Sequence, residues 1–398
     1  MIIKYLKCSG GILIVYLIVH SSFWWTSIHK QFKSGQRSLP TARNLENLTN
    51  ASKFTDNNSS KYIHDKARST VNKSNVYSQA AGIDYQDEMS VRSKQVSVEY
   101  GLKNTSSCSE DPTLIAFDRK TNPVFNGDYI LNNKSICCGP TPITAIVVVH
   151  TAPNHLGLRN KIRATYGSRE LFLPIEIRVV FFLGQVKTPG LQNEILREQS
   201  QYGDIIQGNF MDVYHNLTFK AVMGLHWVSH FCSKVKYVIK TDDDVMFDMW
   251  RFLKLINAKN LYVSKTIYGI INSDGTIFRG GKWAVDKDRF KGQEKYPFKF
   301  CNGFVLIYSS DVIPVLYRAS YTVPLLWLDD VYVTGMLRIA SDGINLINNG
   351  GNLTLDPDSR NGYDCLKRRG DDCPCLAVGV RESNFHNTWK LIKARNHK

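Results

Sequence analysis

The feature that most constrains the fold is PITAIVVVH at positions 142–150, a run of β-branched and other apolar residues that ends in a histidine. A strand with one face in water alternates polar and apolar residues, whereas a strand buried on both faces of a parallel sheet is apolar almost throughout. Residues 142–150 therefore predict a central strand of a sheet that is covered on both faces. A packed domain begins with this strand.

Strand-like and helix-like segments alternate after this run. Strands are predicted at 175–184, 204–210 and 235–240, and helices at 191–203 and 214–232, with Leu217, Ala221, Leu225 and Val228 on one face of the second helix. The alternation predicts an α/β domain with a mostly parallel central sheet, in which ligands bind at the carboxyl ends of the strands. The sequence lacks G-x-G-x-x-G and G-x-x-x-x-G-K-[ST], the signatures of dinucleotide oxidoreductases and P-loop enzymes.

Three consecutive carboxylates, Asp242, Asp243 and Asp244, follow the predicted strand YVIK at 237–240. Adjacent like charges repel one another, most strongly where an apolar strand has just excluded water, and a bound cation would relieve this repulsion. A solvated acidic turn is the simpler interpretation, because aspartate is common in turns.

Two further segments carry charge that suits a nucleotide site. LRNKIRATYG at 158–167 offers Arg159, Lys161 and Arg163 to a diphosphate, although a solvated basic helix face would look the same. WLDDVYVTGML at 327–337 places Asp329 and Asp330 at the start of a predicted helix, where capping alone would account for one of them.

The N-terminus predicts a membrane anchor. GGILIVYLIVHSSFWW at 10–25 is uncharged and ends in aromatic residues of the kind found at a membrane interface. A helix of about 18 residues spans roughly 27 Å, which suits a thin early secretory bilayer. We expect a cytoplasmic tail at 1–8, a signal-anchor at 9–25, a luminal stem at 26–139 and a catalytic domain at 140–398. A cleaved signal peptide is the alternative, but no A-x-A-like cleavage site follows.

Sequons and cysteines indicate that most of the chain lies in the secretory lumen. Asn-x-Ser/Thr occurs at Asn47, Asn50, Asn57, Asn58, Asn72, Asn104, Asn133, Asn216 and Asn352. Cys8 precedes the anchor, and the other eight cysteines form an even set whose pairing the sequence leaves open (Cys108, Cys137, Cys138, Cys232, Cys301, Cys365, Cys373 and Cys375). A metal site at Cys373 and Cys375 is the competing interpretation, without a second pair at suitable spacing to support it.

The net charge of +15 indicates an anionic partner such as a nucleotide, a nucleic acid or a membrane surface. Zinc-finger spacing, an RNA-recognition signature and a basic heptad region are all missing from the sequence. We therefore expect no nucleic-acid partner, and nothing in the sequence decides the oligomeric state.

Taken in order, the motifs from about residue 142 to 345 resemble the β-1,3-glycosyltransferases of the galactosyltransferase and N-acetylglucosaminyltransferase type, glycosyltransferase family 31. The family element R-x-x-I-R-x-T-W is matched by Arg159, Ile162, Arg163, Thr165 and Tyr166, and D-x-Y-x-N-L-T-x-K by Asp212, Tyr214, Asn216, Leu217, Thr218 and Lys220. K-x-D-D-D corresponds to Lys240 and Asp242 to Asp244, the aromatic Y-P-x-Y-x-x-G segment in part to Tyr296, Pro297 and Gly303, and E-D-V-Y-V to Asp329 through Val333.

The resemblance implies a GT-A type nucleotide-sugar-binding domain in a Golgi type II membrane enzyme. Such an enzyme transfers a hexose or an N-acetylhexosamine from a UDP-sugar to a glycan acceptor on protein or lipid, with inversion. Of these sugars, galactose is the one we expect. It implies Mn²⁺ or Mg²⁺ as cofactor, with Asp244 and His386 as metal ligands and Asp330 as the catalytic base. Arg159, Arg163, Lys240, Asp242, Asp243 and Asp329 are then expected to bind substrate or to hold the loop around it.

Departures from the family pattern are conservative. Tyr166 replaces the usual Trp, Asp329 replaces the usual Glu, and Thr334 separates Val333 from Gly335. Asn216 lies inside a family motif, so we expect this sequon to be buried and unmodified. A glycoside hydrolase would also need two carboxylates, but without a metal. A catalytically silent, lectin-like luminal membrane protein is the main alternative to a UDP-sugar-dependent hexosyltransferase.

Overall fold

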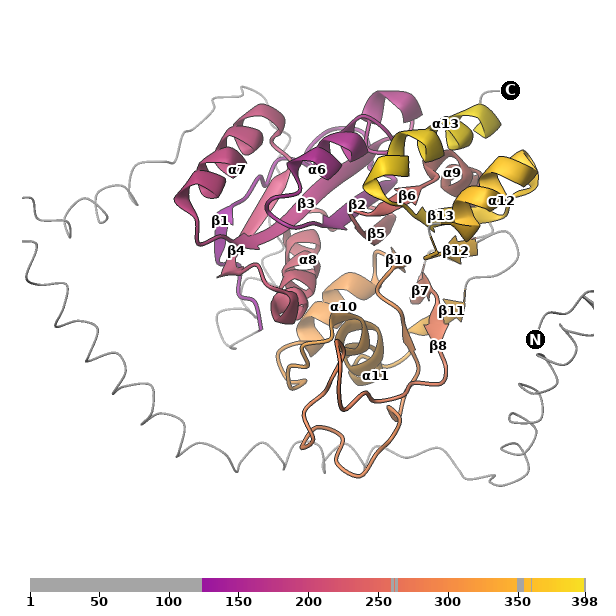
Figure 1. Ribbon diagram of the computed structural model, residues 1–398. Helices are drawn as coiled ribbons and strands as arrows, with labels where there is room; N and C mark the ends of the chain where they lie inside the picture. The colour runs from indigo at the N-terminus through magenta and orange to yellow at the C-terminus, as the bar shows by residue number, and fades with distance from the viewer. Residues whose placement is uncertain (1–123, 259–260, 262–263, 349–353, 359, 397–398) are drawn as a thin grey trace, which may run out of the picture. The chain divides into compact units, whose positions relative to one another are not determined.

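The computed structural model describes residues 124–258, 261, 264–348, 354–358 and 360–396 (Figure 1). An eight-stranded sheet runs through this domain in the order β1-β4-β3-β2-β5-β10-β7-β11. Its strands are β1 (Tyr129–Leu131), β2 (Ala145–His150), β3 (Ile177–Gln185), β4 (Ile205–Met211), β5 (Tyr237–Asp242), β7 (Thr266–Gly269), β10 (Val305–Ser309) and β11 (Asn345–Asn348).

The sheet is mixed rather than mostly parallel, which corrects the prediction from the sequence. β4, β3, β2 and β5 are parallel neighbours, and β11 is parallel to β7. β10 is antiparallel to both β5 and β7, and β1 is antiparallel to β4. The sequence predicted the parallel half because its strands alternate with helices, whereas β10 follows a long segment with little regular structure after β7.

Helices cover both faces of the sheet (Figure 1). The α-helices are α6 (Leu156–Arg163), α7 (Pro189–Tyr202), α8 (Leu217–Phe231), α9 (Met249–Asn257), α10 (Val312–Ala319), α11 (Arg338–Ala340), α12 (Asn361–Arg369) and α13 (Phe385–Asn396). Short turns of helix lie at η3 (Arg169–Phe172), η4 (Tyr214–Asn216), η6 (Gly370–Asp372) and η7 (Glu382–Asn384), and η5 (Val331–Leu337) is π-helical.

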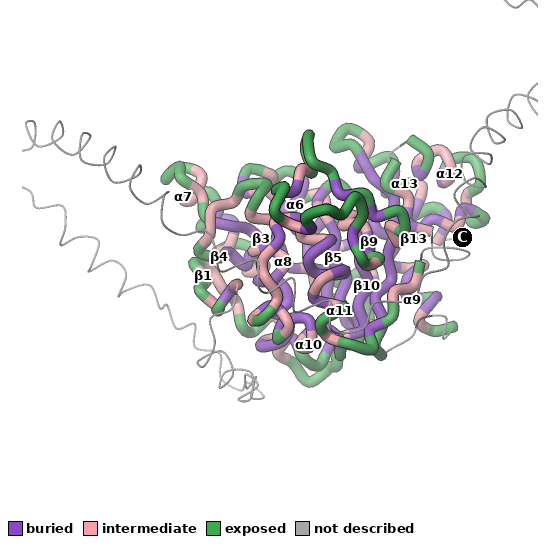
Figure 2. Tube along the Cα trace, turned by 90° about the horizontal axis from the view of Figure 1, so that it is seen from below, coloured by how far each residue is buried: buried purple, intermediate pink, exposed green. Residues whose placement is uncertain are grey.

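The buried run that opens the domain supplies both halves of the core. Val147 and Val149 of β2 pack with α6 on one face of the sheet, whereas Ile146 and Val148 pack with α8 on the other. Successive side chains of a strand point to opposite faces, so an uninterrupted apolar run is what a doubly covered strand requires. Figure 2 shows the buried trace of β5 and β10 inside an exposed surface.

The other predicted elements agree with the structure to within a few residues. Segment 214–232 divides into η4 and α8, and α8 is buried on nearly all sides rather than on the single face that was expected. The reason is its position, because α8 packs against the sheet and also against α10 and η5.

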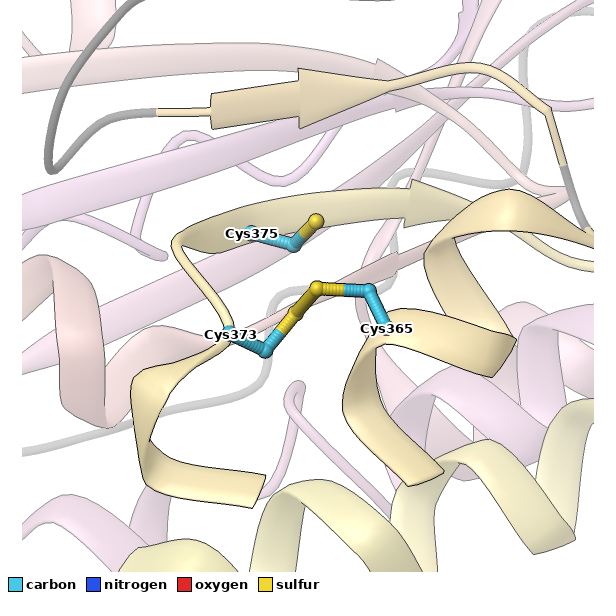
Figure 3. A group of neighbouring side chains, drawn as sticks. All are labelled: Cys365, Cys373 and Cys375. Carbon is cyan, nitrogen blue, oxygen red and sulfur yellow. A yellow bond between two sulfur atoms is a disulfide. The ribbon is translucent and has the colours of Figure 1, made fainter. Parts of the chain in front are cut away.

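Two smaller sheets complete the domain. β6 (Val245–Phe247) pairs with β13 (Cys375–Gly379), which also pairs with β12 (Thr354–Asp356). β8 (Ile271–Asn272) pairs with β9 (Phe300–Cys301). A disulfide joins Cys365 and Cys373 beside β13, with the thiol of Cys375 next to it (Figure 3).

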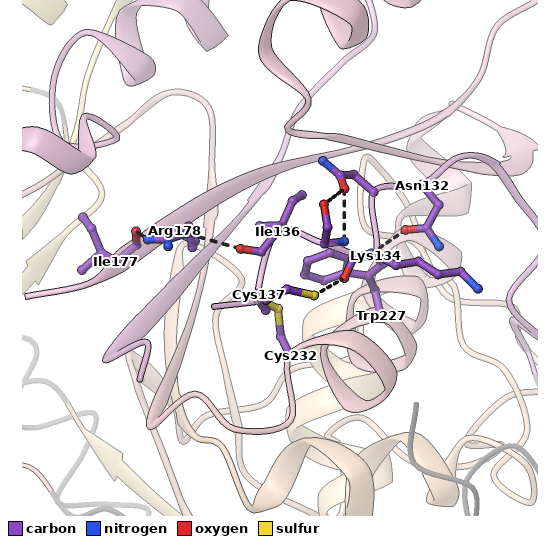
Figure 4. The surroundings of a disulfide bond; sticks show 11 residues. Asn132, Lys134, Ile136, Cys137, Ile177, Arg178, Trp227 and Cys232 are labelled. Carbon is purple, nitrogen blue, oxygen red and sulfur yellow. Dashed lines mark hydrogen bonds between the residues drawn. A yellow bond between two sulfur atoms is a disulfide. The ribbon is translucent and has the colours of Figure 1, made fainter. Parts of the chain in front are cut away.

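Residues 124–139, which the sequence analysis assigned to the stem, belong to the packed domain. Phe125 is buried, β1 forms the edge of the main sheet, and a disulfide joins Cys137 to Cys232 at the end of α8 (Figure 4). These contacts are made with residues distant in sequence, so local composition could not indicate them. The predicted tail, anchor and residues 26–123 of the stem lie outside the described residues, among which no helix is both long and apolar enough to cross a membrane.

Candidate active site

Lys240 and Asp242 form the centre of the candidate site, near the carboxyl end of β5. The Lys240 ammonium is buried between β2 and β10 and donates to Asp242 Oδ1 at 2.8 Å. It also donates to the Gly303 carbonyl at 2.6 Å. An ammonium in this position must be paired, because an unpaired buried charge is costly.

Gly303 joins Lys240 to the predicted base. Its backbone N–H donates to Asp330 Oδ2 at 3.3 Å, while Asp330 Oδ1 accepts from the Val331 N–H at 2.8 Å. A Cβ on Gly303 would lie 3.4 Å from the Asp330 Cβ and 3.8 Å from Lys240 Nζ, so the backbone approaches both side chains closely. Asp330 caps η5, as the sequence predicted for one of the two carboxylates.

The carboxylates of this cluster hold protons more tightly than usual. Burial and the neighbouring Asp329 raise the pKa of Asp330 to about 7, against the opposing effect of Val331 N–H and Lys240. Loss of surrounding water raises the pKa of Asp242 to about 6, which Lys240 partly offsets. Burial works to lower the pKa of Lys240, but Asp242 and Asp329 outweigh it and leave that pKa raised.

A small pocket lies beside this cluster, between the face of the sheet at β2, β5 and β10 and the helices α8 and α10. Its polar lining consists of His150, Lys240, Tyr308, Asp329 and Asp330. Burial, followed by Lys240 and Lys220, lowers the pKa of His150 well below its ordinary value, so its imidazole is neutral. The structure thus brings Lys240, Asp329 and Asp330 together around one space, with Asp242 bound to the same lysine.

Asp243 turns away from this pocket and fixes the loop after β2. Its Oδ2 atom accepts from Thr151 Oγ1 at 2.5 Å and lies 2.8 Å from His155 Nδ1. The buried carboxylate therefore positions the loop after β2. Thr151 and His155 were not predicted as site residues, although both follow the first predicted strand, where sites of this class form.

Asp244 has the environment of a cation ligand. Its side chain is exposed, and it has no ion-pair partner among the described residues. Partial loss of hydration around its carboxyl group, followed by the charge of Asp243, raises its pKa. Two neighbouring carboxylates with raised pKa values, Asp242 and Asp244, carry negative charge that the chain leaves partly uncompensated, which suits a hard divalent cation.

His386 does not join these carboxylates in the structure. It lies in the first turn of α13 and is exposed. Across the described ranges, the group of three or more metal-ligating side chains within 4.8 Å of one another is Cys365, Cys373 and Cys375, and it does not include Asp242, Asp244 or His386. Two of those cysteines, Cys365 and Cys373, form a disulfide, so their sulfur atoms are not thiolate ligands for a metal.

Arg159 and Arg163 are paired within the protein, and Arg159 holds the loop after β2, which is one of the two roles expected for these arginines. All the N–H groups of the fully buried Arg159 point to Glu198, Thr151 Oγ1 and the carbonyls of Ala152 and Pro153. Arg163 binds Asp204 and Glu198. The spacing of the two arginines on α6 indicated a polar face, but the sequence did not show that acidic partners from α7 and from the turn before β4 cover it.

The second family motif braces the same loop. Lys220 Nζ donates to the Thr151 carbonyl at 2.8 Å and pairs with Asp212, whose Oδ2 atom accepts from Gly184 N–H at 2.6 Å. The sequon in this motif is engaged internally: Asn216 Nδ2 donates to the Met211 carbonyl at 2.9 Å. Its Thr218 is fully buried. Asn216 itself is half-buried rather than buried as expected, and its lack of modification stays a prediction.

Tyr166, which stands where the family has Trp, is completely buried near the acidic triplet. Its hydroxyl has no hydrogen-bond partner within the described part of the chain. Burial and then Asp243 raise its pKa. The replacement therefore preserves an aromatic core residue and adds a hydroxyl that the described structure leaves unsatisfied.

Replacing Arg159 tests its structural role. Arg159→Met should lower the free energy of unfolding by about 3 kcal/mol, because Glu198 would keep only Arg163 as a buried partner. Lys161→Met is the matched control on the same helix, since its partner Glu382 is exposed, and it should change stability by less than about 0.5 kcal/mol. Urea unfolding measures both. If the Arg159→Met protein had normal stability but reduced affinity for UDP, Arg159 would instead be assigned as a direct nucleotide contact.

Comparisons with known proteins identify the family of this chain. The galactosyltransferase family model matches residues 158–348. β-1,3-Galactosyltransferase 1 of Homo sapiens is 34% identical over 285 residues, which cover 70% of this chain and 82% of that protein. β-1,3-Galactosyltransferase 5 of Homo sapiens is 32% identical over 198 residues, covering 49% of this chain and 63% of that protein.

Among solved structures, the galactosyltransferase LgtC in complex with donor and acceptor sugar analogues is 10% identical, covers 63% of this chain and 96% of its own, and has a TM-score of 0.34. The sequence relatives, the matched family model and the ordered motifs are mutually consistent. The chain belongs to the β-1,3-glycosyltransferases of glycosyltransferase family 31 and is a hexosyltransferase.

Proposed function

We propose that this enzyme transfers galactose from UDP-galactose to a hydroxyl of a glycan acceptor on a glycoprotein or glycolipid and forms a β-1,3 linkage. The names of the β-1,3-galactosyltransferase relatives support galactose as the sugar. The observation that carries the proposal is the Asp330 carboxylate, which lines the pocket beside Lys240 and has a pKa near neutrality. The nucleotide-sugar-binding domain is proposed to be of the GT-A type.

The reaction is a single displacement. The acceptor oxygen bonds to the anomeric carbon as the bond from that carbon to the diphosphate oxygen breaks, and the hydroxyl proton passes to Asp330. A base with a pKa near the working pH is both ionised often enough and strong enough to accept that proton. Gly303 N–H and Val331 N–H fix the orientation of the carboxylate. Attack opposite the leaving group inverts the anomeric configuration.

Asp244, with Asp242 beside it, would hold a divalent cation, Mn²⁺ or Mg²⁺. When bound, that cation supplies positive charge for the leaving diphosphate. Asp243 keeps the turn rigid through Thr151 and His155, so that the two outer carboxylates stay in position. Lys240 keeps Asp242 oriented. His386 as an additional ligand stays a prediction from the family resemblance alone.

We also propose a Golgi location with the catalytic domain in the lumen. Support comes from the apolar segment at 10–25, the sequons of the predicted stem and the disulfides of the catalytic domain. Basic residues flank both ends of that segment, so the sequons rather than the charges suggest the orientation.

The direct experiment incubates the purified chain with Mn²⁺, a panel of UDP-sugars and a panel of glycan acceptors. Transfer of galactose in a β-1,3 linkage, identified by nuclear magnetic resonance, is the expected result. A lectin-like protein would bind glycans but would neither transfer the sugar nor hydrolyse the donor, so the absence of both reactions would favour that alternative.

Asp330→Asn tests the base. The change keeps the shape of the side chain and removes its basicity, so kcat should fall by about 10²- to 10⁴-fold while UDP-galactose affinity stays nearly unchanged. Asp329→Asn is the matched control on the adjacent residue and should be milder. Steady-state kinetics and donor titration measure these effects. Greater damage at Asp329, or a product that retains the donor's α configuration, would contradict the assignment.

The pH dependence of kcat/KM provides a second test. Because the pKa of Asp330 is raised to about 7, its ionised form is lost as pH falls through neutrality. The value of kcat/KM should therefore drop about tenfold per pH unit below pH 6.5 in saturating Mn²⁺. His150, Lys240, Tyr308 and Asp329 are the charged or titratable groups that line the pocket with Asp330. The residual activity of Asp330→Asn should lack this drop, and an unchanged profile would argue for another base.

Asp244→Asn tests the metal ligand without relying on turnover. In calorimetry, UDP should bind the wild-type chain more tightly with Mn²⁺ than without it, and the variant should lose that difference. The thermal transition should not fall, because the exposed carboxylate has no ion-pair partner among the described residues and its raised pKa shows that its charge is unfavourable there. An identical dependence of UDP affinity on Mn²⁺ in the variant would remove Asp244 from the site.

A further inference from the structure

Exposed aromatic side chains gather on one surface of the domain. Within the described residues the exposed aromatic side chains are Tyr202, Tyr214, Phe278 and Trp283, and Arg163 stacks on the first of them. The other three are 41%, 48% and 50% exposed, and they contact one another. We call Tyr214, Phe278 and Trp283 the aromatic platform. A contiguous exposed patch of large apolar side chains commonly marks a binding surface.

The platform is held in a fixed arrangement. Trp283 Nε1 donates to the Tyr214 hydroxyl at 3.1 Å, and the ring of Phe278 lies 5.9 Å from that of Trp283. Lys282 Nζ lies 4.8 Å from the Tyr214 ring and 5.8 Å from the Trp283 ring, and it has no carboxylate partner in the described ranges. The ammonium thus stabilises both rings through cation–π contacts and keeps free N–H groups at the surface.

The platform is continuous with the loop that carries the proposed base. Trp327 packs against Tyr214 with ring centroids 5.7 Å apart, and its Nε1 atom donates to the Ala284 carbonyl at 3.1 Å. Trp327 precedes Asp330 by three residues, so their Cα atoms are within about 11 Å of one another. The same loop is also bound to α8, because Thr218 Oγ1 donates to the Leu326 carbonyl at 2.7 Å.

We propose that the aromatic platform is the acceptor subsite, where the sugar that follows the reacting residue of the glycan packs its C–H face on Trp283 and Tyr214. A pyranose ring has one face of C–H groups that suits an aromatic ring, and hydroxyls at its edge that suit Lys282 N–H groups. The inference rests on the proposed function, because it assigns a second substrate to the site built around Asp330.

A lipid bilayer is the other surface that aromatic and lysine side chains contact. The location of the platform favours the glycan. Its rings contact Trp327, which lies three residues before the proposed base in the same loop. Its two halves come from separate segments, η4 and the loop between β8 and β9, which meet beside Trp327. Membrane contact alone would not require this continuity.

Substitutions on the platform separate acceptor binding from donor chemistry. In the full-length chain, Trp283→Ala should raise the acceptor KM about tenfold, while the rate of UDP-galactose hydrolysis by water stays unchanged. Trp283→Phe keeps a ring face and should restore most of the affinity. Leu196→Ala, a change at a side chain that is 44% exposed on α7, is the matched control and should alter neither quantity.

Saturation-transfer nuclear magnetic resonance tests binding without turnover, using the methyl β-glycosides of galactose, glucose, N-acetylglucosamine and N-acetylgalactosamine. At least one should receive magnetisation from the wild-type chain at its C–H face and lose it in Trp283→Ala and in Tyr214→Ser. The second variant keeps the test decisive if the first fails to fold.

Unchanged acceptor KM and unchanged saturation transfer in both variants would overturn the acceptor subsite. Weaker binding of Trp283→Ala to phosphatidylcholine–phosphatidylserine vesicles, with acceptor KM unchanged, would overturn it in favour of a membrane contact. A wild-type chain that neither transfers nor hydrolyses UDP-galactose would instead defeat the proposed function, while the glycoside signals would still report on the platform.

Discussion

The buried ammonium of Lys240 is the interaction on which the active site depends. It pairs with Asp242, acts across the pocket on Asp329 and Asp330, and donates to the same glycine whose N–H orients Asp330. At an effective dielectric constant of 20, one such pair at 4 Å is worth about 4 kcal/mol before desolvation is subtracted. Its removal would leave carboxylates crowded in a partly buried space, so the lysine stabilises both the fold and the chemistry.

One ammonium does not balance all the carboxylates that surround it. Asp242, Asp244 and Asp330 all have raised pKa values, which means that each is more difficult to ionise in the folded protein than in water. This excess negative charge costs stability, and proteins retain such costs mainly at functional sites. Two processes would reduce this negative charge. A cation bound at Asp244 would offset the charge of the acidic turn, and the Asp330 carboxylate becomes neutral when it accepts a proton.

The sequence predicted the parts of the protein that depend on local pattern. The apolar run at 145–150, the alternating elements and the acidic triplet at the end of a strand are all visible as periodicity or spacing. It could not predict contacts made across long sequence distances. Glu198 covers Arg159, and β10 enters the sheet antiparallel after a long loop. Both depend on tertiary packing, which residue type alone does not specify.

The same limit applies within the candidate site. Asp330 as a helix cap and Lys240 beside Asp242 follow from neighbours in sequence. The separation of Asp243 from Asp242 and Asp244 does not, because it depends on Thr151 and His155 of another loop. Three adjacent carboxylates looked equivalent in sequence, and the structure assigns them different partners.

Residues near the end of the chain fix the position of Asp244. β6 begins immediately after Asp244 and pairs with β13, and the Val380 N–H donates to the Asp244 carbonyl at 2.8 Å. Arg395 of α13 stabilises the pairing of β6 with β13. It donates to Asp248 Oδ2 at 2.7 Å and to the carbonyls of Cys373 and Cys375. The matched family region ends at residue 348, yet the backbone of the proposed metal ligand is held by residues beyond it. The C-terminal segment is therefore part of the catalytic domain in a physical sense, because without it the acidic turn would lose the strand that sets its direction.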